Sequence, residues 1–480
     1  MPDYVNHCAS FRDPSGFVFL QHGTLYRQVN RSYAADYELL MGSGLYKKLT
    51  DEKLLIPHTE IAENYTQTPD WYKTLQPQPI SFISYPYEWS VAQLKEAALL
   101  TLKVLTIAME HGMILKDATP YNIQFHEGAL IFIDSLSFEK YDPALPWIAY
   151  RQFCECFLFP LYLSHYLQTD MQKYGSVYLE GIPVALTARL LPLKSRLSMG
   201  VWLHVYLQNS VSKGRTGKAP AGHPGAGTPA PSFTRNKLQN LIRHLQSEIS
   251  RLCVKNPPPS TWSNYYSETI LGHDYLHAKE EIFRTFIRDI DFGSALDAGA
   301  NDGYFSKVLA EQGKNVIAID SDHRCINSLY TETQQTRDPR PGHAPSDVAP
   351  GPILPLCMDI ANLSPAIGFL NRERTAFLER VNVDLVAALA LVHHLVLGRN
   401  IPLDAVADLF AALTQTWLII EFVPLTDPKA QELIKHKTQF HPYDETTFEN
   451  CFLRHFIIDK KEKVPGTGRI LYQMKKHAKT

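Results

Sequence analysis

The stretch SALDAGANDGYFSKVLAEQGKNVIAID, residues 294–320, decides the fold of the C-terminal half of the chain. Its first residues predict a strand that ends in a glycine-bearing turn. The spacing of apolar residues over Tyr304–Gln312 predicts a helix after that turn, and a second apolar run then ends at Asp320. Strand, turn, helix and strand in this order form half of a doubly wound βαβ unit.

The turn between the first strand and the helix carries candidate binding residues. Glycine has no Cβ, so Gly299 and Gly303 let the backbone approach a ligand closely. The next helix presents its N-terminal amide groups to the same place. Asp320, about twenty residues further on, is placed to accept hydrogen bonds from ribose hydroxyls. The turn reads D-x-G-x-N-D-G, however, and this fits poorly with the G-x-G-x-x-G of dinucleotide sites.

The same turn resembles the first motif, D/E-x-G-x-G-x-G, of the class I (Rossmann-like) S-adenosylmethionine (SAM) methyltransferases. Asn301 replaces the middle glycine, and asparagine tolerates left-handed backbone angles better than most residues. The resemblance implies SAM as the cofactor. It also implies a set of cofactor-binding residues, namely Asp297, Gly299, Asn301, Gly303, Asp320 and, near the adenine, Asp359. The alternative is an ordinary strand-to-helix turn of an α/β protein.

Further segments predict the rest of the sheet. The segments 355–359, 383–395 and 417–424 read as strands. The second has a continuous apolar run, which suits a central parallel strand, and exits into two histidines. Residues 452–459 and 469–474, joined by the turn at 464–468, read as a closing antiparallel pair. Strands that alternate with helical stretches predict an α/β fold with a doubly wound Rossmann-like sheet, and the methyltransferase resemblance covers about residues 278–476.

Two histidines, His393 and His394, follow the fourth predicted strand, where open α/β sheets bind ligands. A histidine there can remove the proton from an attacking hydroxyl, so both are candidate catalytic residues. The alternative is that one caps a helix and the other packs in the core. Glu421, at the end of the fifth strand, either contacts substrate or is structural. No N-P-P-Y motif follows the fourth strand, which argues against an enzyme directed at adenine or glutamine.

The N-terminal half carries a second pattern. Residues 90–111 predict a helix that begins at a capping box of Ser90 and Gln93. Asp117 and Asn122 follow it in a D-x-x-x-x-N spacing, and an apolar strand then ends at Asp134. This order resembles the catalytic and metal-binding loops of protein kinases and aminoglycoside-type kinases. The resemblance implies Asp117 as the residue that accepts the hydroxyl proton, and Asn122 and Asp134 as magnesium ligands for ATP.

Residues upstream support the kinase resemblance only in part. Residues 17–20 and 24–29 read as a small-lobe hairpin, Arg27 stands where a phosphate-contacting lysine is expected, and residues 80–87 read as the strand before the hinge. The glycine-rich loop is missing, and Leu115 occupies the place of the usual histidine. Three alternatives therefore remain: an active phosphotransferase, a pseudokinase scaffold, and a helical accessory domain whose Asp and Asn serve turns.

Composition limits the remaining possibilities. A length of 480 residues predicts two or three domains. A formal charge of −2 gives no reason to expect a nucleic-acid partner. Seven cysteines without zinc spacing predict a reducing, cytoplasmic location. Neither a secretion signal nor a membrane span is expected, since the most apolar window, residues 153–167, is too short. The expected domains are 1–206, kinase-like or accessory; 207–277, an insertion, helix and linker or lid; and 278–480, the methyltransferase domain.

Low-complexity composition predicts disorder for residues 212–234 and 334–352. The main hypothesis is a SAM-dependent methyltransferase that acts on a hydroxyl of a small molecule or glycan. The order of the two halves is similar to that of bacterial methyltransferases of the nodulation and surface-glycan type. The sequence leaves the acceptor and the oligomeric state open.

Overall fold

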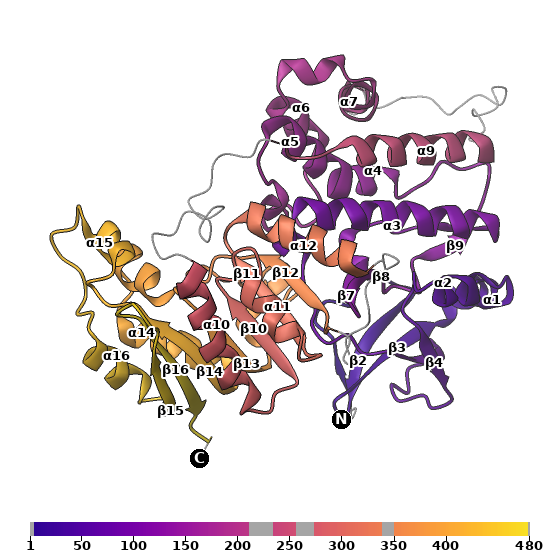
Figure 1. The fold of residues 1–480 in the computed structure, drawn as a ribbon. Coiled ribbons are helices and arrows are strands. Elements are labelled where there is room, and N and C mark those ends of the chain that lie inside the picture. The colour runs from indigo at the N-terminus through magenta and orange to yellow at the C-terminus, as the bar shows by residue number, and fades with distance from the viewer. Residues whose placement is uncertain (1–3, 211–233, 256–272, 338–349, 479–480) are drawn as a thin grey trace, which may run out of the picture. The chain divides into compact units, whose positions relative to one another are not determined.

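The computed structural model describes residues 4–210, 234–255, 273–337 and 350–478 (Figure 1). The chain divides into two compact units. The first unit contains Met1–Pro258 together with the short segment Ala366–Arg374, and the second contains Pro259–Pro365 and Thr375–Thr480. Most of residues 212–234 and 334–352, for which disorder is predicted, lie outside the described residues, but Gln334–Arg337 continue a helix.

The first unit begins with a five-stranded antiparallel sheet. Its order is β1-β2-β3-β5-β4, where the strands are β1 (Tyr4–Asn6), β2 (Gly16–Gln21), β3 (Thr24–Asn30), β4 (His58–Ile61) and β5 (Trp71–Pro77). The β2–β3 hairpin turns at His22 and Gly23, whose φ angles of 49° and 79° are those of a tight two-residue turn. Two short helices, α1 (Ala34–Gly42) and α2 (Leu45–Asp51), connect β3 with β4.

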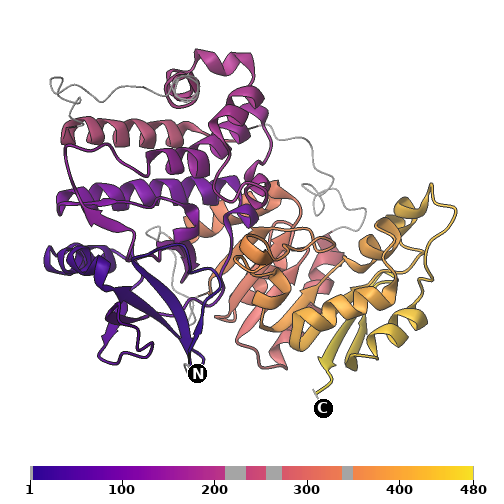
Figure 2. The same cartoon turned by 180° about the vertical axis from the view of Figure 1, so that it is seen from behind.

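Helices make up most of the rest of the first unit (Figure 2). The longest, α3 (Val91–Glu110), begins at the predicted capping box, because the Ser90 hydroxyl accepts from the Gln93 amide. Two small two-stranded sheets follow: β7 (Ile123–His126) and β8 (Ala129–Phe132) form a hairpin, and β6 (Met113–Leu115) pairs with β9 (Phe138–Lys140). The later helices are α4 (Tyr150–Phe153), η4 (Cys154–Leu158), α5 (Phe159–Leu167), α6 (Val184–Leu190), η6 (Leu193–Leu197), α7 (Met199–Val201), η7 (Trp202–Leu207) and α9 (Arg235–Arg251).

The prediction of a strand over residues 80–87 is wrong. Among the described residues of the sheet, the strand before the helical region is β5, and only a single 3-10 turn, Pro86–Glu88, follows it. Pro79, just before this segment, and Pro86 within it lack an amide hydrogen, which disfavours a continuous sheet ladder there. The apolar window at residues 153–167 is a buried helical run, and no helix in the described part of the chain is long and apolar enough to cross a membrane.

The second unit is a seven-stranded sheet in the order β12-β11-β10-β13-β14-β16-β15 (Figure 1). The parallel strands are β10 (Ser294–Ala298), β11 (Asn315–Asp320), β12 (Ile353–Cys357), β13 (Val383–Ala388) and β14 (Thr414–Phe422). β16 (Ile470–Lys476) runs antiparallel to both β14 and β15 (Phe456–Lys463). The doubly wound sheet and its closing antiparallel pair were both expected from the sequence.

Helices pack against the sheet of the second unit. α10 (His273–Arg288), α11 (Tyr304–Ala310) and α12 (His323–Arg337) share one apolar core with β10 and β11. α14 (Leu403–Leu413) packs against β13, β14 and α16 (Glu445–Phe452), while α13 (Phe377–Arg380) and α15 (Pro428–Ile434) are short. Asp444 caps the start of α16, and this helix continues to Phe452. A turn follows, so β15 begins at Phe456, four residues later than predicted.

The segment Ala366–Arg374 lies between β12 and β13 in sequence but belongs to the first unit. The Arg12 guanidinium donates to both carboxylate oxygens of Glu373, at 2.9 and 3.0 Å. Arg374 lies over the Tyr121 ring at 4.1 Å, and Phe369 contacts Phe11 at a ring-centroid distance of 5.4 Å. The first unit is therefore discontinuous in sequence, whereas the predicted domains are continuous segments.

Candidate functional site

The turn after β10 is left-handed at alternate residues. Gly299, Asn301 and Gly303 have φ angles of 79°, 52° and 78°. The amides of Gly299 and Ala300 both donate to the carbonyl of Ile319, so the turn is fixed against the end of β11. A Cβ on Gly303 would lie 2.4 Å from the Leu329 side chain. Glycine is therefore strongly favoured at position 303, and asparagine at 301 takes the left-handed angle that the sequence analysis assigns to it.

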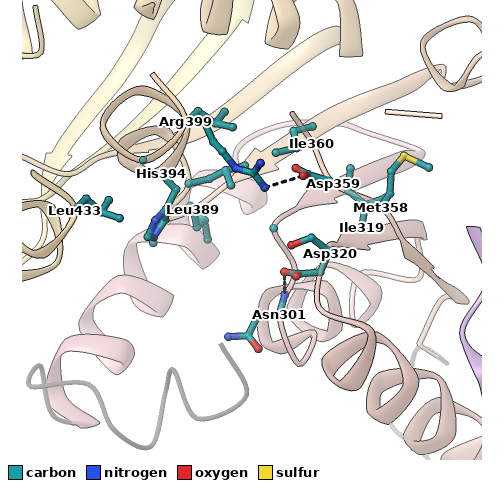
Figure 3. Close-up of a pocket in the computed structure, with 16 residues that line it drawn as sticks. Asn301, Ile319, Asp320, Met358, Asp359, Ile360, Leu389, His394, Arg399 and Leu433 are labelled. Atoms are coloured by element: carbon teal, nitrogen blue, oxygen red, sulfur yellow. Dashed lines mark hydrogen bonds and ion pairs between the residues drawn. The ribbon is translucent and has the colours of Figure 1, made fainter. Parts of the chain in front are cut away.

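Asp320 ends β11 beside this turn. Its two carboxylate oxygens accept from the amides of Asn301 and Asp322, at 2.9 and 2.8 Å (Figure 3). Burial raises the pKa of Asp320, and these amide hydrogen bonds act in the opposite direction. A carboxylate offers about four acceptor positions, so Asp320 keeps capacity for a ligand hydroxyl.

Asp297 lies behind the turn. It is 3% exposed, and it accepts a hydrogen bond of 2.6 Å from the Ser306 hydroxyl on α11. Burial raises the pKa of Asp297 to about 6, against the opposing effect of Ser306. Asp297 and Gly303 shape the turn, but neither is among the residues that line the adjacent cavity.

A cavity of about 290 Å³ opens at the carboxyl ends of the parallel strands. Its volume is near the lower end of the range for small-molecule sites. The lining includes four of the predicted cofactor residues: Gly299, Asn301, Asp320 and Asp359. Figure 3 shows Asp320 and Asp359 on one side and Leu389, His394 and Leu433 on the other.

Asp359 lies two residues beyond the end of β12. Its carboxylate pairs with the guanidinium of Arg399 at 2.8 Å, and the Arg399 side chain is 61% exposed (Figure 3). Met358 and Ile360, its sequence neighbours, add apolar surface to the same wall of the cavity. Arg399 follows a helical turn, η9 (His394–Gly398), and was not recognised from the sequence, because no local pattern marks an arginine that pairs across 40 residues.

The two histidines after β13 differ in position. His394 lines the cavity, whereas His393 is fully buried and is not part of the lining. Neither ring nitrogen of His393 has a hydrogen-bond partner among the described residues. Burial lowers the pKa of His394 to about 4 and lowers that of His393 well below its ordinary value. Both rings are therefore neutral near pH 7 and bind a proton less readily than a free imidazole, and of the two, His394 is the one that lines the cavity.

Glu421 has a structural position. It is fully buried at the end of β14, where it accepts from Tyr275 at 2.9 Å and pairs with Lys279 of α10. Its second carboxylate oxygen also accepts from the Ala390 amide at 2.8 Å. Ala390 has a φ of 51° and lines the cavity, so Glu421 holds a strained residue of the binding site in place.

The first unit brings together a second set of predicted residues. Asp134, just beyond β8, pairs with Arg27 of β3 at 2.5 Å. Burial alone would raise the pKa of Asp134, but Arg27 and hydrogen bonds from Ser137 and the Leu136 amide hold it below its ordinary value. This cation on β3 and carboxylate after β8 were both proposed from the kinase resemblance.

Asp117 and Asn122 lie near this pair. Asn122 donates to the Ser137 hydroxyl at 3.0 Å, and that hydroxyl donates to Asp134 at 2.6 Å. Burial, and then the charge of Asp134, raise the pKa of Asp117. Three of about four acceptor positions of Asp134 are thus already used, by Arg27, the Leu136 amide and Ser137. In this arrangement the residues do not fit a magnesium site.

Comparison with known proteins gives one extensive match in sequence. No family model matches the chain. Over 469 residues, the chain is 30% identical to nodulation protein NoeA of Rhizobium meliloti (strain 1021), and the match covers 96% of this chain and 94% of NoeA. The chain belongs to the NoeA family. The aligned region therefore includes most residues of both units of this chain.

Solved structures similar to this NoeA-family protein match at lower identity. Magnesium protoporphyrin IX methyltransferase ChlM from Synechocystis PCC 6803 is 13% identical, with 45% of this chain and 92% of ChlM covered and a TM-score of 0.32. N-methyltransferase NodS from Bradyrhizobium japonicum WM9 is also 13% identical, covering 43% and 98%, with a TM-score of 0.31. The bifunctional kinase-methyltransferase WbdD is 18% identical, covering 42% and 38%, with a TM-score of 0.27. Likeness at this level does not bear on activity.

Proposed function

We propose that this NoeA-family protein is a SAM-dependent methyltransferase that acts on a hydroxyl group of a small molecule or glycan. The cavity of the second unit carries this proposal. It joins the left-handed turn at Gly299 and Asn301 to the carboxylates of Asp320 and Asp359 at the carboxyl ends of adjacent parallel strands. Open α/β sheets bind nucleotide-like ligands at this edge.

The residues present fit SAM as the cofactor. A Cβ at Gly299 would lie 3.3 Å from Leu391, so a side chain there would crowd the wall of the cavity. Asp320 has acceptor capacity for ribose hydroxyls, and Met358 and Ile360 supply apolar surface for a flat base beside Asp359. SAM, when bound, supplies an electrophilic methyl group on a sulfonium.

The protein's own residues would orient the acceptor and remove its proton. Methyl transfer depends mainly on alignment of the two reactants, so the rigid turn and the Glu421–Ala390 hydrogen bond are expected to matter through positioning. His394 lines the cavity, whereas His393 does not, and this position makes His394 the proposed acceptor of the hydroxyl proton; its lowered pKa makes it a weaker base than a free histidine. His393 is buried away from the lining, so its proposed role is to support His394.

Calorimetric titration with SAM and S-adenosylhomocysteine tests the cofactor proposal. Binding is expected for the wild type and is expected to weaken by roughly tenfold or more in Asp320→Asn, because the variant exchanges an acceptor oxygen for an NH2 donor. Asp291→Asn is the matched control, since Asp291 is exposed and does not line the cavity. A folded wild type that binds neither compound would refute the proposal. Transfer of labelled methyl from SAM to a panel of hydroxylated sugars then tests the acceptor class, with His394→Gln as the catalytic variant.

The contacts of Asp134 favour a second proposal, for the first unit: a kinase-like scaffold without phosphotransferase activity. Arg27 already neutralises Asp134, and Asn122 is engaged by Ser137. ATP titration with and without magnesium separates the alternatives. The scaffold proposal predicts no magnesium-dependent binding, whereas magnesium-dependent binding that is lost in Asp134→Ala would establish an ATP site and favour a bifunctional enzyme.

A further inference from the structure

One corner of the first unit exposes an unusual amount of apolar surface. The segments α6, η6, α7 and η7 follow one another along the chain, and Figure 1 shows α6 and α7 at the edge of this unit away from the five-stranded sheet. Seven large apolar side chains of these segments are more than one-third exposed, and we call them the apolar corner: Leu190, Leu193, Leu197, Met199, Trp202, Leu203 and Leu207. Leu197 is 91% exposed and Leu193 is 75% exposed, although large apolar side chains are usually buried.

The local sequence explains why these side chains face outward. Pro192 and Ser198 bound η6 and split the segment into short turns. Each turn buries its own set of residues, with Leu191, Val201 and Val205 in the core. The side chains of the apolar corner lie on the opposite face of the same turns, so they do not take part in the core of the unit.

The chain segment that carries the apolar corner bears charge of one sign, and Glu248, whose carboxylate lies against Gly200, is buried. No Asp or Glu occurs between Glu180 and Glu248, whereas the chain as a whole has 49 acidic residues in 480. Arg189, Lys194 and Arg196 are exposed within this region. In the part of the chain that the structure describes, none of the three forms an ion pair with a carboxylate. Their charges are available to an anionic surface.

We propose that the apolar corner docks this protein on the surface of an anionic lipid bilayer. Leucine, methionine and tryptophan side chains beside exposed Lys and Arg match the chemistry of an interfacial membrane segment, where apolar groups enter the headgroup boundary and cations contact lipid phosphates. Arg196 also lies over the Tyr206 ring, at 5.1 Å, and keeps its charge there. Tryptophan is enriched at this depth, because its ring is apolar and its N–H is polar. A chain segment without Asp or Glu suits an anionic lipid surface better than a protein partner of ordinary composition.

Vesicle co-sedimentation of the full-length protein tests the proposal. The probes are vesicles of equal parts phosphatidylglycerol and phosphatidylcholine, and vesicles of phosphatidylcholine alone. Sedimentation is expected with the anionic vesicles and is expected to fall at about 0.5 M salt, because salt screens the headgroup charge. Two double variants, Leu193→Ser with Leu197→Ser and Lys194→Glu with Arg196→Glu, are each expected to weaken the partition by roughly tenfold or more.

A matched control separates this surface from general stickiness. Leu145 and Ile148 of the same unit are 59% and 73% exposed outside the apolar corner, so Leu145→Ser with Ile148→Ser should sediment like the wild type. Equal binding to both vesicle types, or no loss in either corner variant, would overturn the proposal. Absence of vesicle binding would also overturn it, and a dimer that is lost in the leucine variant would then assign the corner to contact between copies of this chain.

Discussion

Replacement of Gly303 by alanine tests the turn that positions the candidate site. The change has two energetic consequences. An alanine at a φ of 78° is strained by about 1 kcal/mol, because its Cβ approaches the following carbonyl. The new Cβ would also lie 2.4 Å from a terminal carbon of Leu329, which is fully buried in the core of the second unit. Overpacking of this kind costs about 1–3 kcal/mol, so we expect a total destabilisation of about 2–4 kcal/mol.

Gly466→Ala is the matched control. Gly466, in the turn between β15 and β16, has a φ of 72° with no atom within 4 Å of a built Cβ, so it carries the backbone strain alone. Hydrogen exchange followed by mass spectrometry measures the opening free energy of peptides from β10 and α11 for Gly303→Ala, and of peptides from β15 and β16 for the control. The reasoning is refuted if Gly303→Ala destabilises its own peptides no more than Gly466→Ala does.

Three further changes probe buried charge. Glu421→Gln should destabilise the second unit by about 3–5 kcal/mol, since it leaves Lys279 buried without a counter-charge, as measured by urea unfolding. Asp297→Asn should flatten the dependence of stability on pH: the folded pKa of about 6 exceeds the ordinary 3.8, so the wild type loses roughly 3 kcal/mol as pH rises from below 4 to above 6. Asp134→Asn should destabilise the first unit by about 3 kcal/mol, because Arg27 keeps its charge.

Each of these changes has an outcome that contradicts it. A loss below about 1 kcal/mol in Glu421→Gln would mean that Lys279 is solvated or neutral in the folded protein. A pH profile of Asp297→Asn that overlays the wild type would remove Asp297 as the titrating group. For Asp134→Asn, the companion variant Arg27→Met should recover part of the lost stability, and a double variant less stable than the sum of the single changes would deny the pairing.

Local sequence patterns were sufficient to predict the helices and strands that depend on residues close together in the sequence. The helix after Ser90 and the βαβ unit at residues 294–320 were predictable, because capping, glycine position and apolar spacing act within a few residues. The strand expected at residues 80–87 did not form for a reason of the same local kind, since Pro79 precedes the segment and Pro86 lies within it.

Contacts between distant residues were not predictable. The Arg12–Glu373 pair spans 361 residues, and the Arg399–Asp359 pair spans 40, with no pattern in the sequence that links the partners. In the candidate site, the sequence identified Asp320 and Asp359, whose positions follow from strand ends. It did not separate His394 from His393, because one residue of helical rotation decides which side chain lines the cavity.

The segment Ala366–Arg374 has a consequence for how this protein is made. The first unit lacks part of its packing until residue 374 has left the ribosome, more than a hundred residues after Pro258. At a synthesis rate of about 5–20 residues per second, this delay lasts on the order of ten seconds. During that time Arg12 and Tyr121 lack their contacts with Glu373 and Arg374. A protein truncated after Pro258 would keep those surfaces open permanently. The two halves are therefore expected to be inherited and expressed as one polypeptide, since splitting the gene between them would leave the first product incomplete.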